Sequence, residues 1–138
     1  MVEQTWSGAR MKTIICIDSY HNGVPVGRIY NPTFGVDTFK SLSQFLLKME
    51  TMLDESKMPQ SSTAKRTFFN IADALEADPA PSQSRRGELA TFELRVIFRQ
   101  HTSWQGVVTW LEAQMEQSYR SVLELILLMD SALREAEK

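Results

Sequence analysis

The chain has 138 residues, the length of one ordinary domain, and its 43% hydrophobic, 23% charged and 9% aromatic composition is typical of globular proteins. Fifteen basic against seventeen acidic side chains give a net charge of -2, which excludes the global positive field that attracts nucleic acid. The apolar runs are far shorter than the roughly 20 residues needed to cross a bilayer, and no signal peptide is recognisable. We expect a cytoplasmic protein with one core.

Residues 1–10 carry no regular pattern and are expected to form a disordered extension, with Met11 as a hypothetical natural start. A single domain is expected over residues 11–138. The one cysteine, Cys16, lies in a run of isoleucines, where a buried thiol behaves as a small hydrophobe. We therefore predict a structural cysteine.

The first elements form a predicted β-hairpin. A β-branched run over residues 13–20 predicts a strand, Asn22-Gly23 is typical of a two-residue type I′ turn, and a second strand follows over residues 24–30. Pro25 lacks an N–H for the ladder, which indicates that at least the start of the second strand lies at a sheet edge.

Residues 39–53 have the apolar spacing of an amphipathic helix. Two N-caps are open: Asp37, or Ser41 paired with Gln44 three residues later in a capping box. A short strand is predicted over residues 63–69, and a Pro- and Ser-rich loop over about 70–87 is expected to be mobile.

The second half is predicted to be a strand-rich segment closed by a helix. Apolar alternation over residues 90–99 predicts a strand whose core face includes Phe98. A strand over residues 104–112 is expected to be buried on both faces, and a short one over 114–119 is possible. A capping box at Ser121 starts a helix that ends near Lys138.

The predicted order is therefore ββαβββ(β)α, with no internal repeat. We expect an α+β domain in which an antiparallel sheet of five or six strands packs one face against two helices.

No catalytic or cofactor motif is recognisable in the chain. It lacks a phosphate-binding glycine loop, a dinucleotide fingerprint, a nucleophile elbow and a metalloprotease histidine pair. The two histidines, His21 and His101, both fall in predicted turns, where a solvated imidazole is common. We predict no catalytic residue, no metal ligand and no cofactor, and we place an enzyme third among the possible functions.

A local basic region is the first candidate binding site. Arginine side chains and an indole suit phosphate contact and base stacking, which makes a nucleotide or RNA site possible at Arg95, Arg99, His101 and Trp104. A solvated strand face beside a loop explains the same residues, and we favour this reading because the whole chain is acidic.

The tryptophan strand and the last helix form the second candidate. The helix carries more apolar residues than one core-facing stripe needs, and aromatic and Met side chains are enriched at protein interfaces. A possible interface comprises Trp104, Trp110, Tyr119, Leu123 and Leu127. Burial in the core would explain the same pattern equally well. We predict a non-enzymatic binding or regulatory module that acts through protein contacts and self-associates, with nucleotide or RNA binding as the alternative.

The last third of the chain resembles a known signature. The segments Ser103-Trp-Gln-Gly-Val-Val-Thr-Trp-Leu-Glu112 and Tyr119-Arg-Ser-Val-Leu-Glu-Leu-Ile-Leu-Leu-Met-Asp-Ser-Ala-Leu133 are similar to the C-terminal signature of a family of small uncharacterised bacterial proteins. The resemblance implies a bacterial cytosolic protein and brings no activity, substrate or catalytic residue.

Overall fold

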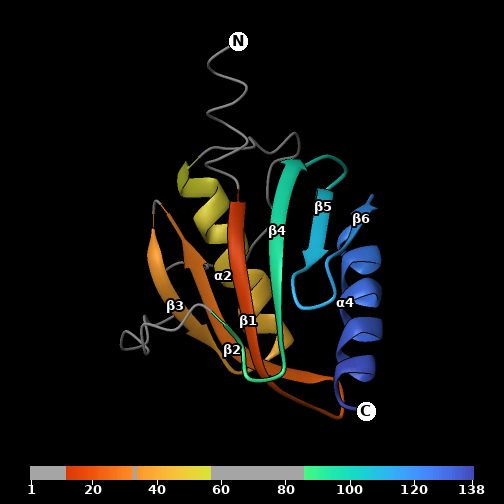
Figure 1. Ribbon diagram of the computed structural model, residues 1–138. Helices are drawn as coiled ribbons and strands as arrows, with labels where there is room; N and C mark the ends of the chain where they lie inside the picture. Colours follow the sequence, from red (N-terminus) through yellow and green to blue (C-terminus); the bar gives the residue numbers. More distant parts are fainter. Residues whose placement is uncertain (1–11, 33, 57–85) are drawn as a thin grey trace.

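A computed structural model describes residues 12–32, 34–56 and 86–138. The elements are β1 (Lys12–His21), β2 (Val24–Asn31), β3 (Gly35–Phe39), α2 (Leu42–Ser56), β4 (Ala90–Phe98), β5 (Gln105–Trp110), β6 (Met115–Tyr119) and α4 (Val122–Ala136). The strands form one sheet in the order β3-β2-β1-β4-β5-β6, and every neighbouring pair is antiparallel (Figure 1). The α+β class was predicted correctly, and the six strands agree with the predicted antiparallel sheet of five or six.

The strand content differs from the prediction in the first half. β3 was not predicted, because its five residues give no clear apolar alternation and only Phe39 among them is buried. The predicted strand over residues 63–69, the extension over 1–10 and most of the predicted mobile loop lie outside the described residues. The six described strands therefore include β3, which was not predicted, and the predicted strand at 63–69 is not one of them.

The first hairpin agrees with the prediction. Asn22 and Gly23 have φ of 54° and 76°, as a type I′ turn requires. β3 pairs with β2 only from Gly27 onward, so that Pro25 pairs with Tyr20 of β1 and faces no third strand among the described residues. Pro25 thus lies at the edge of the sheet, although β2 as a whole is an inner strand.

Both helices begin with a capping box. Ser41 Oγ accepts a hydrogen bond from Gln44 N at 3.1 Å, and Ser121 Oγ accepts one from Glu124 N at 3.1 Å. In return, the side chains of Gln44 and Glu124 accept bonds at 2.8 Å from the backbone N–H groups that precede the serines. Ser41 is therefore the cap of α2, whereas Asp37 lies in β3.

A β-bulge in β4 corrects the predicted faces of that strand. The register with β5 shifts between Val96 and Phe98, which inserts one residue at Ile97. Phe98 is therefore 55% exposed instead of lying in the core, while Arg99 turns inward and is 4% exposed. β5 is also corrected: its burial alternates, so one face is covered and not two.

The chain contains an internal structural repeat that the sequence did not reveal. The N-terminal unit (β1–β3 and α2) and the C-terminal unit (β4–β6 and α4) have the same element order. Ile14 pairs with Glu93, which lies 79 positions later. At the same offset Thr13 corresponds to Phe92 and Ile15 to Leu94, so the pair Thr13–Leu94 is equivalent to the pair Ile15–Phe92. A pseudo-twofold axis therefore passes through the Ile14–Glu93 pair.

Special backbone features obey the same offset. The β1 register shift between Ile17 and Ser19 corresponds to the β4 shift between Val96 and Phe98. The positive-φ turn at Asn22-Gly23 corresponds to a positive-φ turn at His101-Thr102. Gly27 corresponds to Gly106, and an added Cβ at either one would lie within 2 Å of a backbone carbonyl oxygen of the neighbouring strand. The repeat is one of backbone geometry.

Side-chain identity between the units is sparse, which explains why the sequence shows no repeat. In the helices, at an offset of 80, the identical pairs are Ser41/Ser121, Leu47/Leu127, Met49/Met129, Leu53/Leu133 and Glu55/Glu135. In the strands, the shared property is apolar character at several buried positions, such as the pairs Ile15/Leu94, Ile17/Val96 and Ile29/Val108.

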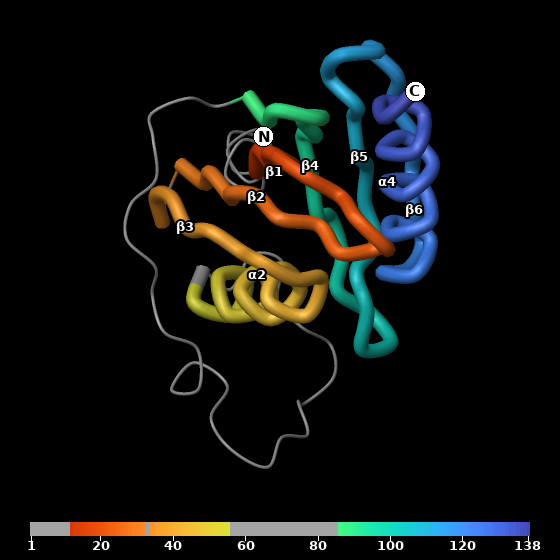
Figure 2. Tube along the Cα trace, turned by 90° about the horizontal axis from the view of Figure 1, so that it is seen from below, coloured from red at the N-terminus to blue at the C-terminus, as the bar shows by residue number. Residues whose placement is uncertain are grey.

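The two helices share one face of the sheet. α2 lies beside the β1–β3 side and α4 beside β5 and β6 (Figure 2). Side chains of both helices, Phe45 and Met129 among them, enter the same core as Ile17 and Phe39 of the sheet. The predicted arrangement of two helices on one face is therefore correct.

Candidate binding site

The residues of the predicted nucleotide site are not brought together. Arg99 and Trp104 are 4% and 3% exposed, and both contact acidic side chains of α2. Arg99 Nη1 lies 2.8 Å from Asp54 Oδ1 and 3.3 Å from Glu50 Oε1, and Trp104 Nε1 donates to Glu50 Oε1 at 2.7 Å. These two side chains hold the sheet to α2.

The other two members of that set lie elsewhere. Arg95 lies on the outer face, within 4.0 Å of Glu93 and 3.6 Å of Glu116. Regular alternation would put Arg95 and Arg99 on one face, but the bulge at Ile97 turns them to opposite faces. His101 is exposed in the β4–β5 turn with φ of 58°. No continuous basic patch joins these four residues.

The residues of the predicted interface separate into a buried and an exposed group. Trp104 and Tyr119 are buried, and Tyr119 Oη donates to the Arg95 carbonyl oxygen at 2.9 Å. Trp110 is partly buried against the core. Leu123 and Leu127, by contrast, are 68% and 58% exposed. These two residues, one turn apart on the outer side of α4, form what we call the leucine ridge.

The charges beside the leucine ridge are neutralised within α4 and its N-terminus. Arg120 Nη2 lies 2.7 Å from Glu124 Oε2, and Arg134 Nε lies 2.8 Å from Asp130 Oδ2. The hydrogen bond from Arg120 lowers the pKa of Glu124, and hydrogen bonds from Tyr20 and Arg134 lower that of Asp130. All four groups are charged at neutral pH, so the ridge has no net charge on its flanks.

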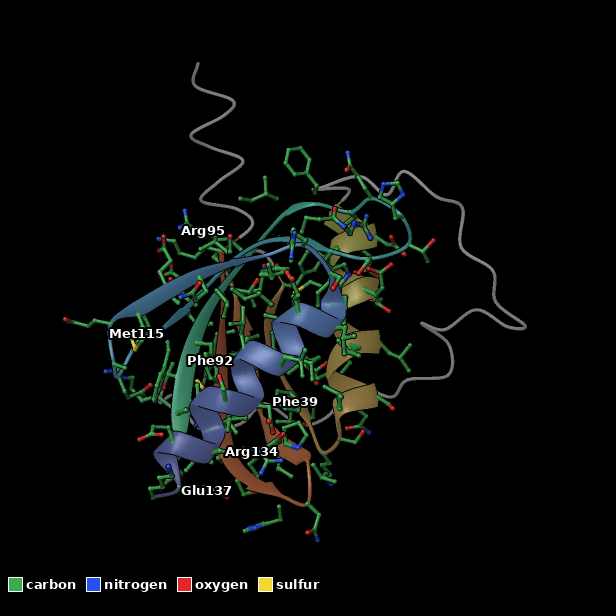
Figure 3. The ribbon with its side chains drawn as sticks, turned by 90° about the vertical axis from the view of Figure 1, so that its right-hand side faces the viewer. Phe39, Phe92, Arg95, Met115, Arg134 and Glu137 are labelled. Atoms are coloured by element: carbon green, nitrogen blue, oxygen red, sulfur yellow. The ribbon has the colours of Figure 1, made fainter. Side chains whose placement is uncertain are left out.

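A cavity of about 320 Å³ lies between α4 and the C-terminal half of the sheet. Its floor follows two cross-strand rows: Phe92, Trp110 and Met115 in one, and Val108 and Gln117 in the next. Its roof is the side of α4 that carries Leu128, Met129, Ser131, Ala132 and Glu135. Figure 3 shows Phe92 beside α4 and Met115 at the neighbouring edge of the sheet. The volume falls within the range of small-molecule sites.

The polar groups of the cavity are few. Gln117, Ser131 and Glu135 contribute to the lining, and Ser131 Oγ already donates to the Leu128 carbonyl oxygen at 2.8 Å. The indole Nε1 of Trp110 is buried and has no hydrogen-bond partner. Leaving such a donor unsatisfied costs about 1–3 kcal/mol, so this N–H requires an explanation.

The equivalent place in the N-terminal unit is polar. Thr13 and Asn31 stand where Phe92 and Trp110 stand in the C-terminal unit, and they share a hydrogen bond of 3.0 Å. Lys48, equivalent to Leu128, is 8% exposed and binds Asp37 at 3.2 Å and the Thr38 carbonyl oxygen at 2.7 Å.

The helix residue above this place differs as well. Met52 stands in α2 where Ala132 stands in α4. The cavity under α4 therefore coincides with the replacement of a long side chain by a methyl group and of polar pairs by apolar side chains.

Cys16 is fully buried at the outer face of the sheet, paired in register with Arg28 and Thr91. Burial raises the pKa of its thiol to about 11, although Arg28 nearby acts in the opposite direction. The thiol is therefore protonated at neutral pH. Arg28 itself is held by Asp18 at 2.9 Å and by Tyr30.

The sequence did not identify the cavity residues. Phe92, Val108 and Met129 have the spacing of core residues, and nothing in the pattern distinguishes a cavity wall from a filled core. One signal was present in the helix, where Ala132 is the single small residue among large ones on the buried side of α4.

Other kinds of site find no support in the part of the chain that the structure describes. No group of three or more His, Cys, Asp or Glu side chains there could hold a metal ion. Within the same residues, no helix combines the length and apolar character that crossing a membrane demands. Comparison with protein-family models, with curated proteins and with solved structures found no match to the chain.

Proposed function

We propose that the protein is a non-enzymatic binding module that associates with a second copy of itself through the leucine ridge of α4. The observation that carries this proposal is the exposure of Leu123 and Leu127, at 68% and 58%. Side chains of this kind bury apolar area when two helices pack, and each contributes about 1.5–3 kcal/mol when fully buried. The ridge gains most by meeting another apolar surface.

The N-terminal unit supports the proposal as an internal comparison. The position equivalent to Leu123 is Ser43 in α2, whereas the position equivalent to Leu127 is also a leucine, Leu47, which is partly buried. Because the two units share one backbone plan, the fold itself does not require a leucine at position 123. The exposed Leu123 is therefore explained better by contact with a partner than by folding.

A second copy is the occupant that the charges favour. The ion pairs Arg120–Glu124 and Arg134–Asp130 neutralise both ends of the ridge, so two copies approach without net repulsion. A stable interface buries about 800 Å² per partner, which is more than one ridge of two leucines provides. We therefore expect the interface to extend onto β6, where Met115 is 56% exposed at the sheet edge.

The nucleotide or RNA alternative has weaker support. Two of its four residues, Arg99 and Trp104, are already bound to carboxylates of α2, and Arg95 faces the other way. No observation on the described residues favours it over self-association.

Sedimentation over a wide concentration range tests the proposal. We expect the wild type to pass from monomer to dimer with rising concentration, and the double variant Leu123→Glu with Leu127→Glu to stay monomeric. Phe98→Glu is the matched control, because Phe98 is equally exposed but lies at the β4 bulge, and this variant should still dimerise. A wild type that stays monomeric, or a double variant that still dimerises, would refute the proposal.

A further inference from the structure

The cavity between α4 and the strands β4–β6 has the properties of a ligand site. We propose that it binds a neutral, largely apolar small molecule that carries one hydrogen-bond acceptor. This inference does not rest on self-association, because the leucine ridge is not among the residues that line the cavity; Met115 is the one lining residue that the expected dimer interface also includes.

The size of the cavity sets the size of the ligand. An apolar cavity of about 150 Å³ is enough to take up benzene. At about 320 Å³, the cavity under α4 has room for a body of roughly two fused rings or an acyl chain of similar volume.

The lining sets the chemistry of the ligand body. Six of the residues, three aromatic or β-branched ones on the floor (Phe92, Trp110 and Val108) and three on the roof (Leu128, Met129 and Ala132), present apolar side chains. Met115 adds a flexible apolar side chain at the exposed edge, where it can adapt to a ligand. Such walls offer no compensation to a charged or strongly polar body.

The unsatisfied donor sets the polar group of the ligand. Trp110 contributes to the cavity wall, and its Nε1 is buried without an acceptor. A carbonyl or ether oxygen on a molecule in the cavity supplies the missing partner once the indole turns its Nε1 toward that molecule. An anionic acceptor is disfavoured because the charged residue in the lining is the carboxylate of Glu135. The ligand is therefore a neutral acceptor.

The N-terminal unit carries different side chains at the equivalent place. There Met52 and Lys48 of α2 stand where α4 has Ala132 and Leu128, and Thr13 and Asn31 are hydrogen-bonded to each other on the sheet. The apolar lining and the small Ala132 therefore belong to the C-terminal unit and are not a requirement of the shared backbone plan, as expected for a binding site.

The probe for the test is 6-propionyl-2-dimethylaminonaphthalene, a neutral two-ring ketone whose fluorescence shifts to the blue in apolar surroundings. We expect saturable binding to the full-length protein with a blue shift. Naphthalene, which lacks the acceptor, and the anion 8-anilinonaphthalene-1-sulfonate, which carries a charge, should both bind more weakly.

Two variants locate the probe. Ala132→Met places in α4 the residue that α2 carries at Met52, and it should weaken binding by about tenfold or more, because the room is filled. Trp110→Phe keeps the ring and removes the N–H. It should weaken binding of the ketone about three- to tenfold and leave naphthalene unchanged, as the loss of one hydrogen bond implies. Thermal melts establish whether each variant is folded. If Ala132→Met does not fold, Trp110→Phe alone tests the location of the probe.

Two controls keep the inference separate from the proposed function. The double variant Leu123→Glu with Leu127→Glu should bind the ketone as the wild type does, whether or not the wild type dimerises. Met52→Ala opens the equivalent place in α2 but should create no second site, because its floor is polar and paired. Absence of saturable binding, unchanged binding in both cavity variants, or loss of binding in the leucine variant would each overturn the inference.

Discussion

Tyr20 and Arg99 occupy equivalent positions of the two units, and each binds the helix of the opposite unit. Tyr20 at the end of β1 donates a hydrogen bond to Asp130 of α4, while Arg99 after β4 pairs with Asp54 of α2 at 2.8 Å. The bulges in β1 and β4 turn both side chains toward the helices. A side chain of each unit therefore binds the helix of the other unit, and we expect the two units to unfold together as one cooperative domain.

The Arg99 network gives the first prediction. Arg99→Leu should lower the free energy of unfolding by about 3 kcal/mol, because it removes the buried partner of Asp54 and Glu50. The matched control is Arg134→Ala, which breaks the Arg134–Asp130 pair at an arginine whose side chain is 71% exposed. That change should cost far less stability than Arg99→Leu, because water screens an exposed ion pair. Urea denaturation at neutral pH measures both, and equal losses would contradict the assignment of Arg99 to the core.

The fold was predictable where the local signals are strong. The Asn22-Gly23 turn, the serine capping boxes and the alternation from Ala90 to Val96 each depend on short-range chemistry, and each is present in the structure. β3 was missed because exposed residues on an edge strand carry little pattern. The bulge at Ile97 was missed because one inserted residue leaves no compositional mark.

The candidate site was predictable only in part. Leu123 and Leu127 were named from the surplus of apolar residues in the helix, and these are exposed in the structure. Trp104 and Tyr119 were named because aromatic side chains are enriched at interfaces, but they are buried, since spacing alone does not distinguish core from surface. The cavity depends on which side chains face each other across β4, β5, β6 and α4, and that information is absent from any single segment.

The equivalent glycines give a second prediction. A Cβ at Gly106 would lie 1.9 Å from the Arg95 carbonyl oxygen, and a Cβ at Gly27 would lie 1.8 Å from that of Cys16. Backbone must move to relieve either clash, so Gly106→Ala and Gly27→Ala should each cost about 3 kcal/mol, at the upper end of overpacking effects.

The control for these glycines is Gly23→Ala. Its Cβ would meet nothing within 4 Å, and only the φ of 76° opposes it, for about 1 kcal/mol. Chemical denaturation compares the three variants. A loss at Gly106 no larger than at Gly23 would show that the strands there are not as tightly apposed as described.

Cys16 gives a third prediction, on thiol reactivity. Because burial raises the pKa of the thiol to about 11 and the side chain is fully covered, we expect no reaction with Ellman's reagent in the native state at pH 8. One equivalent should react after unfolding in guanidinium chloride. The variant Ser43→Cys supplies the control, because residue 43 is exposed on α2 and its thiol should react at once. Rapid reaction of the wild type would place Cys16 at an accessible surface.

The Tyr20–Asp130 hydrogen bond gives a prediction for both ends of the pH range. Hydrogen bonds from Tyr20 and then Arg134 lower the pKa of Asp130 below its ordinary value of 3.8. The stability that the carboxylate contributes is therefore complete above about pH 4 and is lost as the pH falls through the lowered value. Asp130→Asn should remove this part of the acid dependence and also reduce stability at neutral pH.

The alkaline side has the opposite sign. Burial, and then the hydrogen bond to Asp130, raises the pKa of Tyr20 to about 12. The contribution of the neutral phenol is complete below the ordinary pKa of 10 and is lost as the pH rises through 12. Tyr20→Phe should therefore make the fall in stability between pH 10 and 12 shallower. It should not abolish the fall, because burial also raises the pKa of Tyr119 and the contribution of that residue to the pH dependence remains. Urea unfolding of wild type and both variants across these two ranges tests the pair. An unchanged acid limb in Asp130→Asn together with an unchanged alkaline limb in Tyr20→Phe would mean that this bond does not join the two units in solution.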